Sequence, residues 1–358
     1  MRRLPLVLTT LLTTMILLAS CSSGPGGSGG GGGGGEKRPD SAAVVMVSGG
    51  DATSPFTTPD AACATGLAAG NTNTAIRDFL LSKKYAVYTS PAMAGRGQVT
   101  DQTGFGAFGV CPVTLPENMT VNSTATIDTA GEHLARFINW LNTEKGVTEV
   151  DFVGHSMGGL YSRAAIRVLA TTGSKVKTRS LTTIGTPWQG SYLSDYANGL
   201  IPLTDCVGDS FCETSMKTMR EEVQRTMAGS GREVNQAFLM GKDGWNQFQS
   251  GVLTNIPVVL IAGKKFTLPG PGNPAVWPND GIVSLQSALA KNLTDPVLPH
   301  RRCFTFDDTH SIYVSNAAGL EWKTALTWDP AVLEVVHQAI ADGPKATEAA
   351  NRQDCPAA

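Results

Sequence analysis

The chain lacks an excess of charge of either sign, with 28 Lys and Arg against 30 Asp and Glu among its 358 residues. Because no basic surplus is available to neutralise a phosphate backbone, we do not expect a nucleic acid as a partner. Charged residues are only 16% of the chain and hydrophobic residues 41%, which supports a buried core and excludes a wholly disordered chain. No Cys/His cluster has the spacing of a zinc site, so we expect no metal.

The N-terminal apolar run, residues 4–18, is too short to span a bilayer comfortably, and it follows Arg2 and Arg3. A basic start, a short apolar middle and small residues at the end are typical of an export signal peptide. Its end, LASC at 18–21, resembles the bacterial lipobox. The resemblance implies a signal peptide over 1–20, a diacylglyceryl group on Cys21, and an exported cell-envelope lipoprotein anchored to a membrane surface. A plain secretory signal with an incidental Cys is the alternative.

Residues 21–40 are mostly Gly, Ser, Pro and charged residues, which cannot bury a face, so we expect a flexible linker before a domain over 41–358. Beyond Cys21 six Cys remain, an even number that indicates three disulfides in an oxidising compartment. The sequence does not fix the pairing. A short loop favours Cys206–Cys212, and our expectation for the others is Cys63–Cys111 and Cys303–Cys355.

Segments with strand and helix patterns alternate from residue 42 onward. Apolar runs predict strands at 42–48, 85–88, 150–153, 180–184 and 256–262, and a weaker one at 302–306. Apolar residues at helical spacing predict helices over 74–82, 130–142, 157–170 and 331–340. This alternation predicts the α/β class, with a mostly parallel central sheet flanked by helices. Residues 189–253 show no clear strand, and we interpret them as a helical and loop insertion that serves packing or covers a substrate site.

The sequence Gly154-His155-Ser156-Met157-Gly158 follows a predicted strand and precedes a predicted helix. In that context G-x-S-x-G indicates a sharp strand-to-helix turn that exposes a nucleophilic Ser. Glycines are expected on both sides of the Ser because the turn leaves no room for Cβ atoms. The helix N-terminus favours developing negative charge. Ser156 is therefore the candidate nucleophile.

A Ser hydroxyl needs a base to take its proton, and the chain has five His. His155 should point away along the turn, while His133 and His337 lie within predicted helices. His300 precedes two Arg whose charges oppose its protonation. His310 remains as the candidate base, in a loop after the last predicted strand.

The base needs an acid that holds its ring in one tautomer. Asp280, in the turn NDGIV at 279–283, follows one predicted strand and precedes His310, and it fits this role best. Asn-Asp-Gly is also an ordinary turn sequence. Asp307 and Asp308 are alternatives, although they lie very near His310 in sequence.

The order Ser156, Asp280, His310 is that of the α/β-hydrolases, and the chain resembles the bacterial triacylglycerol lipases of that superfamily. The resemblance is carried by GHSMGGL at 154–160, IGTPWQGS at 184–191, NDGIVS at 279–284 and the loop His310. It implies an α/β-hydrolase fold with a cap insertion at about 189–253, and a nucleophile, an orienting acid and a base at these three positions. It also implies an oxyanion hole made by the N–H groups of Met157 and Gly50, and no cofactor.

The sequence departs from the lipase pattern at three places. Ser48-Gly49 stands where these lipases usually have His-Gly, so Gly49 or Asp51 is an alternative to Gly50 in the oxyanion hole. Trp188 replaces a His of the GTP segment, which changes the expected pocket wall. Some relatives hold calcium with an Asp two residues after the base, and that place is Ile312 here, so we do not expect calcium.

The expected function is a serine ester hydrolase, a triacylglycerol lipase or carboxylesterase that works through an acyl-enzyme on Ser156. The expected partners are a lipid or ester substrate and, through the N-terminal anchor, a membrane. A phospholipase, a short-chain esterase or an acyltransferase with the same triad remains an alternative, as does a non-catalytic lipoprotein that binds a partner. The sequence predicts no oligomeric state.

Overall fold

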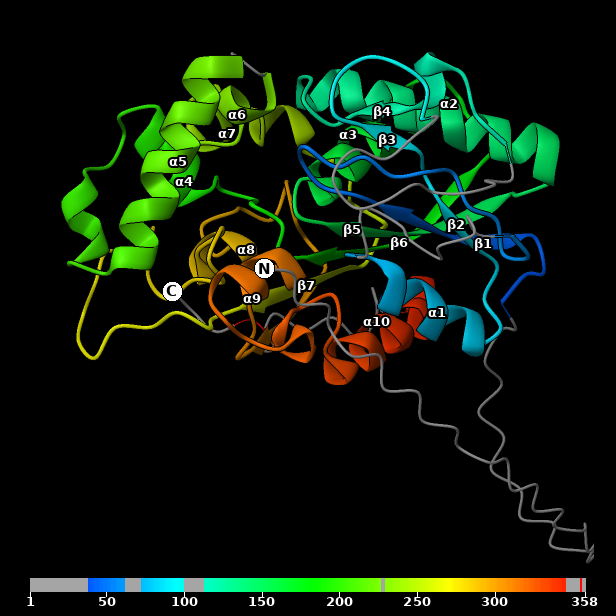
Figure 1. The fold of residues 1–358 in the computed structure, drawn as a ribbon. Coiled ribbons are helices and arrows are strands. Elements are labelled where there is room, and N and C mark those ends of the chain that lie inside the picture. Colours follow the sequence, from blue (N-terminus) through cyan, green and yellow to red (C-terminus); the bar gives the residue numbers. More distant parts are fainter. Residues whose placement is uncertain (1–37, 62–71, 100–112, 227–228, 346–354, 356–358) are drawn as a thin grey trace, which may run out of the picture. The chain divides into compact units, whose positions relative to one another are not determined.

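The computed structural model describes residues 38–61, 72–99, 113–226, 229–345 and 355 (Figure 1). The predicted signal peptide, all but the end of the predicted linker, and Cys21, Cys63 and Cys111 lie outside the described residues. Within the described ranges, no helix combines the length and the apolar character needed to cross a membrane.

A six-stranded sheet forms the centre of the described domain. Its strand order is β2-β1-β5-β6-β7-β8, and every neighbouring pair is parallel. The strands are β1 (Ala42–Val47), β2 (Val87–Thr89), β5 (Glu149–His155), β6 (Lys177–Ile184), β7 (Val258–Gly263) and β8 (Arg301–Phe306). Two short strands, β3 (Ala92–Met93) and β4 (Val121–Asn122), form a separate parallel pair.

Helices cover both faces of the sheet, as Figure 1 shows, so the predicted α/β architecture with a parallel sheet is confirmed. Strand β1 shows why both faces are needed, because all six of its residues are buried. Alternate residues such as Val45 belong to the cluster that includes Leu134 of α2 (Ile127–Lys145) and Leu160 of α3 (Gly158–Thr171). Val44 belongs to the cluster on the other face, with α1 (Thr74–Ser82) and α10 (Pro330–Asp342). A strand buried on both faces reads as a continuous apolar run, which is the pattern seen in the sequence.

The predicted insertion contains helices and no strand in its described part, 189–226 and 229–253. Its helices are α4 (Tyr192–Ala197), α5 (Ser210–Thr226), α6 (Gly229–Glu233) and α7 (Gln236–Met240), with 3-10 turns at Leu203–Cys206 and Gln247–Gln249. A disulfide joins Cys206 to Cys212 at the start of α5. The remaining helices are α8 (Leu285–Ala288) and α9 (Ile312–Ala317), with 3-10 turns at Glu117–Met119, Trp322–Thr324 and Gly343–Lys345. A second disulfide, Cys303–Cys355, ties β8 to the C-terminal segment.

The insertion is attached to the helices over the sheet by buried polar contacts. Arg163 of α3 donates to the Asn246 side-chain oxygen at 2.8 Å, and its guanidinium lies over the rings of Trp188 and Trp245. Trp245 donates from its indole to Asp128 of α2 at 2.9 Å. Because a buried charge is costly without such contacts, this arrangement fixes the insertion to the helix that begins just after Ser156.

Candidate active site

Ser156 occupies the turn between β5 and α3, and its φ of +55° is in the left-handed region that non-glycine residues seldom adopt. The flanking glycines allow this turn. A Cβ on Gly154 would lie 2.6 Å from the carbonyl carbon of Gly158, and a Cβ on Gly158 would lie 2.2 Å from the carbonyl oxygen of Val47. The steric reason given for G-x-S-x-G from the sequence therefore agrees with the structure.

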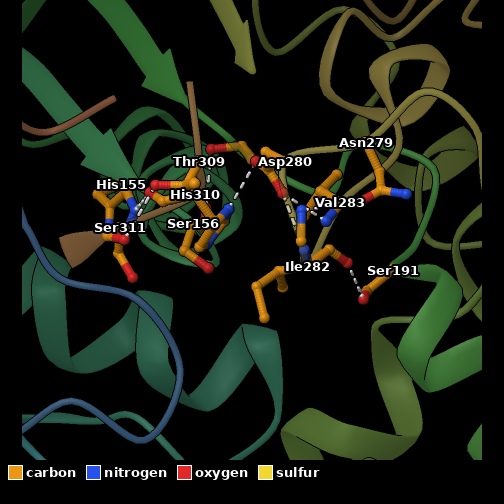
Figure 2. A network of polar contacts seen from close by, with 12 residues as sticks. His155, Ser156, Ser191, Asn279, Asp280, Ile282, Val283, Thr309, His310 and Ser311 are labelled. Atoms are coloured by element: carbon orange, nitrogen blue, oxygen red, sulfur yellow. Dashed lines mark hydrogen bonds and ion pairs between the residues drawn. The ribbon is translucent and has the colours of Figure 1, made fainter. Parts of the chain in front are cut away.

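His310 and Asp280 are joined by a short hydrogen bond at the end of the sheet where the strands finish (Figure 2). His310 Nδ1 lies 2.8 Å from Asp280 Oδ2, and the other carboxylate oxygen accepts from the N–H groups of Ile282 at 2.9 Å and Val283 at 2.8 Å. Asp280 is fully buried and His310 is 5% exposed. A buried carboxylate with these partners favours a proton on Nδ1, which leaves Nε2 as a proton acceptor.

Ser156 and His310 both lie against the end of β6. The Ser156 N–H donates to the carbonyl of Ile184 at 2.8 Å. A Cβ on the next residue, Gly185, would lie 2.9 Å from His310 Nδ1 and 3.1 Å from Asp280 Oδ2. Figure 2 shows the Ser156 side chain beside the His310 ring. Within the described chain no hydrogen bond links the Ser156 hydroxyl to that ring, and catalytic bonds of this kind commonly tighten only when substrate is present.

The chain after β1 passes directly against the nucleophile turn. A Cβ on Gly49 would lie 2.6 Å from Ser156 Cβ, and a Cβ on Gly50 would lie 2.6 Å from the Met157 sulfur. The Asp51 N–H donates to the Ser123 carbonyl at 3.3 Å. No such main-chain bond occupies the N–H of Gly50 or Met157 in the described part of the chain. Of the three alternatives in this loop, Asp51 is therefore the least available to an oxyanion.

The expectation that His155 points away from the site was wrong. Its ring packs on His310, with 4.8 Å between ring centroids, and its Nε2 lies 2.9 Å from the His310 carbonyl oxygen. Burial, together with the neighbouring His310, lowers the pKa of His155 to about 3. No sequence pattern marks this contact, because the direction of a side chain at the end of a strand depends on the loop that packs beside it.

The alternatives to His310 and Asp280 have other contacts. His133 Nδ1 lies 2.7 Å from the Thr120 carbonyl, and His337 Nδ1 lies 2.9 Å from the Tyr85 hydroxyl. Asp307 pairs with Lys265 at 3.1 Å. These side chains are engaged in contacts that do not include Ser156.

Asp308 lies two residues before His310 in the same loop, and its side chain is buried. Burial and the charge of Asp329 raise the pKa of its carboxyl to about 8. Trp188 is likewise a core residue: it is 0% exposed and donates from its indole to Thr183. Trp188 therefore packs in the core and presents no side-chain surface to an open pocket.

Residues 110–205, which include the Ser156 turn, match a family described as "Putative serine esterase (DUF676)". A triacylglycerol lipase of Pseudarthrobacter phenanthrenivorans is 36% identical over 78 residues, which are 22% of this chain and 23% of that protein. A triacylglycerol lipase of Burkholderia plantarii is also 36% identical over 78 residues, or 22% of this chain and 20% of that one. The chain thus matches about a fifth of the length of each of these relatives, and the similarity to lipases is distant and partial.

Solved structures with a similar architecture include two named as a lipase or an esterase. The lipase of Bacillus licheniformis in its propeptide form has a TM-score of 0.42 and 14% identity, over 81% of this chain and 53% of that chain. A Pyrococcus furiosus esterase has a TM-score of 0.41 and 14% identity, over 84% of this chain and 82% of that one. The parallel sheet, its strand order and the strand-to-helix turn at Ser156 define the fold of the described residues. On these grounds the predicted α/β-hydrolase fold is confirmed.

Proposed function

We propose that the protein is a serine ester hydrolase in which Ser156 is the nucleophile, His310 the general base and Asp280 the residue that orients the base. The observation that carries this proposal is the buried His310–Asp280 hydrogen bond of 2.8 Å at the strand end where Ser156 is held in a left-handed conformation. The family match over residues 110–205 supports the same reaction class.

The reaction is acyl transfer from an ester to water. His310 Nε2 takes the hydroxyl proton of Ser156 as the oxygen attacks the ester carbonyl carbon, and it then gives this proton to the leaving alcohol. Water hydrolyses the acyl-enzyme by the same route. The N–H groups of Met157 and Gly50 would hold the oxyanion, and removing one such donor typically costs about 2.7–4 kcal/mol of transition-state stabilisation.

Within this class we propose esters with an apolar acyl chain, as in a lipase or carboxylesterase, and we propose that the insertion covers the site. The partial similarity to triacylglycerol lipases supports this. The stacked rings of Phe211 at the start of α5 and Phe266 lie 4.7 Å apart, beside Gly281 and therefore next to Asp280. Burial and the charge of Glu222 raise the pKa of the Asp51 carboxyl, and Arg225 opposes this rise. These two charges of α5 therefore lie close to the loop that follows β1 and contains Gly50.

The decisive experiment replaces Ser156 with Ala and measures hydrolysis of p-nitrophenyl esters of short and long chains. We expect the rate to fall at least about 10³-fold, with an unchanged circular dichroism spectrum because the side chain is only half-buried. A fluorophosphonate probe should label the natural protein and fail to label the variant. Ser174→Ala, at a surface serine after α3, is the matched control. A Ser156→Ala variant that remains active would refute the proposal.

We further propose that Cys21 carries a lipid that holds the domain at a membrane surface. The basic start, the apolar run over 4–18 and the sequence LASC at 18–21 support this proposal. One short myristoyl-type chain gives only marginal membrane binding, whereas two or more acyl chains anchor a protein stably.

A further inference from the structure

His155 is the last residue of β5, and its side chain is buried against the loop that carries His310 (Figure 2). Its Nε2 lies 2.9 Å from the main-chain carbonyl oxygen of His310. The two imidazole rings are 4.8 Å apart and tilted by 44°. A carbonyl oxygen can only accept a hydrogen bond, so Nε2 of His155 must carry the proton.

The main chain of His310 is held on both sides. Its N–H donates to the Asp280 carbonyl at 2.7 Å, and its own carbonyl accepts from His155 at 2.9 Å. The ring adds the bond from Nδ1 to the Asp280 carboxylate at 2.8 Å. A loop residue bound at all three places has few other positions open to it, so the imidazole is placed before substrate arrives.

The neutral state of His155 also suits its position beside the ring of His310. Burial and the adjacent His310 lower the pKa of His155 to about 3, so its ring is neutral at the pH of ester hydrolysis. Among the described residues, the ionisable side chain that acts on His155 is His310, and the one paired with His310 is Asp280. When His310 takes the proton of Ser156, its new positive charge therefore meets a neutral ring and a carboxylate, and no second cation.

We propose that His155 is a positioning residue of the active site, which holds His310 in line with Ser156 through its bond to the His310 carbonyl and its ring contact. This inference rests on the proposed function, since it requires His310 to be the base. His155 and Ser156 are adjacent in sequence, so one short segment carries the nucleophile and also fixes the base relative to it.

The test compares two substitutions of His155. His155→Phe keeps an aromatic ring and removes the donor, which leaves the buried carbonyl of His310 without its partner. His155→Gln keeps an N–H donor of similar reach. We expect kcat per titrated active site to fall at least about tenfold in His155→Phe with KM within about twofold, and to recover largely in His155→Gln.

A pH profile separates positioning from a loss of folded protein. In His155→Phe the acid limb of kcat/KM should move to lower pH, because a misplaced imidazolium gains less from the Asp280 carboxylate. The Gln variant should keep the natural limb. His337→Phe is the matched control: it loses the 2.9 Å contact with the Tyr85 hydroxyl and should change neither kcat nor the profile.

The outcomes distinguish this inference from the proposed function. If Ser156→Ala is inactive while His155→Phe keeps the natural kcat per site and the natural acid limb, the positioning role is overturned and the hydrolase remains. If Ser156→Ala is active, both fail together. Should His155→Phe not fold, ¹⁵N-histidine NMR of the natural protein decides: we expect a neutral, Nε2-protonated His155 from about pH 5 to 8. Titration in that range, or the other tautomer, would overturn the inference.

Discussion

Replacing Asp280 with Asn tests the proposed triad, because it changes which nitrogen of the His310 ring carries the proton. Asp280 Oδ1 accepts from the N–H groups of Ile282 at 2.9 Å and Val283 at 2.8 Å, while Oδ2 faces His310 Nδ1 at 2.8 Å. An Asn side chain has one oxygen and one NH₂ group. The two N–H donors require an acceptor, so the amide oxygen takes the place of Oδ1 and the NH₂ group faces the imidazole.

An NH₂ group can only donate, so His310 Nδ1 must become an acceptor and the ring proton moves to Nε2. A protonated Nε2 cannot take the proton of Ser156, although the geometry of the site is nearly unchanged. We therefore expect kcat to fall on the order of 10⁴-fold, which corresponds to about 5 kcal/mol of lost transition-state stabilisation.

The assay is hydrolysis of p-nitrophenyl butyrate at pH 7.5, with the folded concentration measured by circular dichroism. Asp307→Asn is the control, because Asp307 lies three residues from His310 and forms an exposed ion pair with Lys265 at 3.1 Å. We expect this control within about twofold of the natural protein. An Asp280→Asn variant that keeps more than a tenth of the natural kcat would show that the tautomer argument is wrong.

Three further predictions concern other residues of the chain. Gly185 and Gly173 have φ of +57° and +68°, so the backbone strain of Ala at either position should cost about 1–2 kcal/mol in urea unfolding. Only Gly185→Ala, whose Cβ would lie 2.9 Å from His310 Nδ1, should also lower kcat, at least about tenfold. Asp308, with its pKa raised to about 8, holds in the folded state a proton that the unfolded chain releases near pH 4, so stability falls as pH rises through this window. Asp308→Asn should therefore raise the free energy of unfolding by about 1–3 kcal/mol at pH 8.5 and by an amount approaching zero near pH 4, and an equal gain at both pH values would contradict the assignment. Cys21→Ala should move the protein from the membrane fraction to the soluble fraction and abolish labelling by radioactive palmitate, whereas unchanged labelling would refute the lipid anchor.

Much of the fold could be predicted because its strongest signals are local. The run at 42–48 became β1 (Ala42–Val47), and the helix over 74–82 has the bounds Thr74–Ser82. The helix predicted over 130–142 extends to Ile127–Lys145, because Thr126 caps its start through the Thr129 N–H and Gly146 ends it at a φ of 67°. Apolar periodicity does not report such caps, so the ends of this helix were missed.

The residues that take part in the reaction could be predicted, whereas those that pack around them could not. Ser156, Asp280 and His310 follow from residue type and order, and the structure brings them to one end of the sheet. His155 was misjudged because the direction of a side chain at the end of a strand depends on what the neighbouring loop places there. The burial of Trp188 could not be predicted, because it depends on Arg163 and the insertion, which are distant contacts with no sequence pattern.

The end of β6 explains why residues so far apart in sequence form one site. The Ile184 carbonyl accepts from the Ser156 N–H at 2.8 Å, and the Gly185 N–H donates to the Ile261 carbonyl of β7 at 2.8 Å. The Thr186 hydroxyl donates to the Ser156 carbonyl at 2.8 Å. This segment supplies no reacting group, yet it supports the strained turn of the nucleophile and leaves the space in which the imidazole lies. The left-handed conformation of Ser156 is costly by itself, so we infer that these contacts, made across three parallel strands, are what allow the chain to keep it.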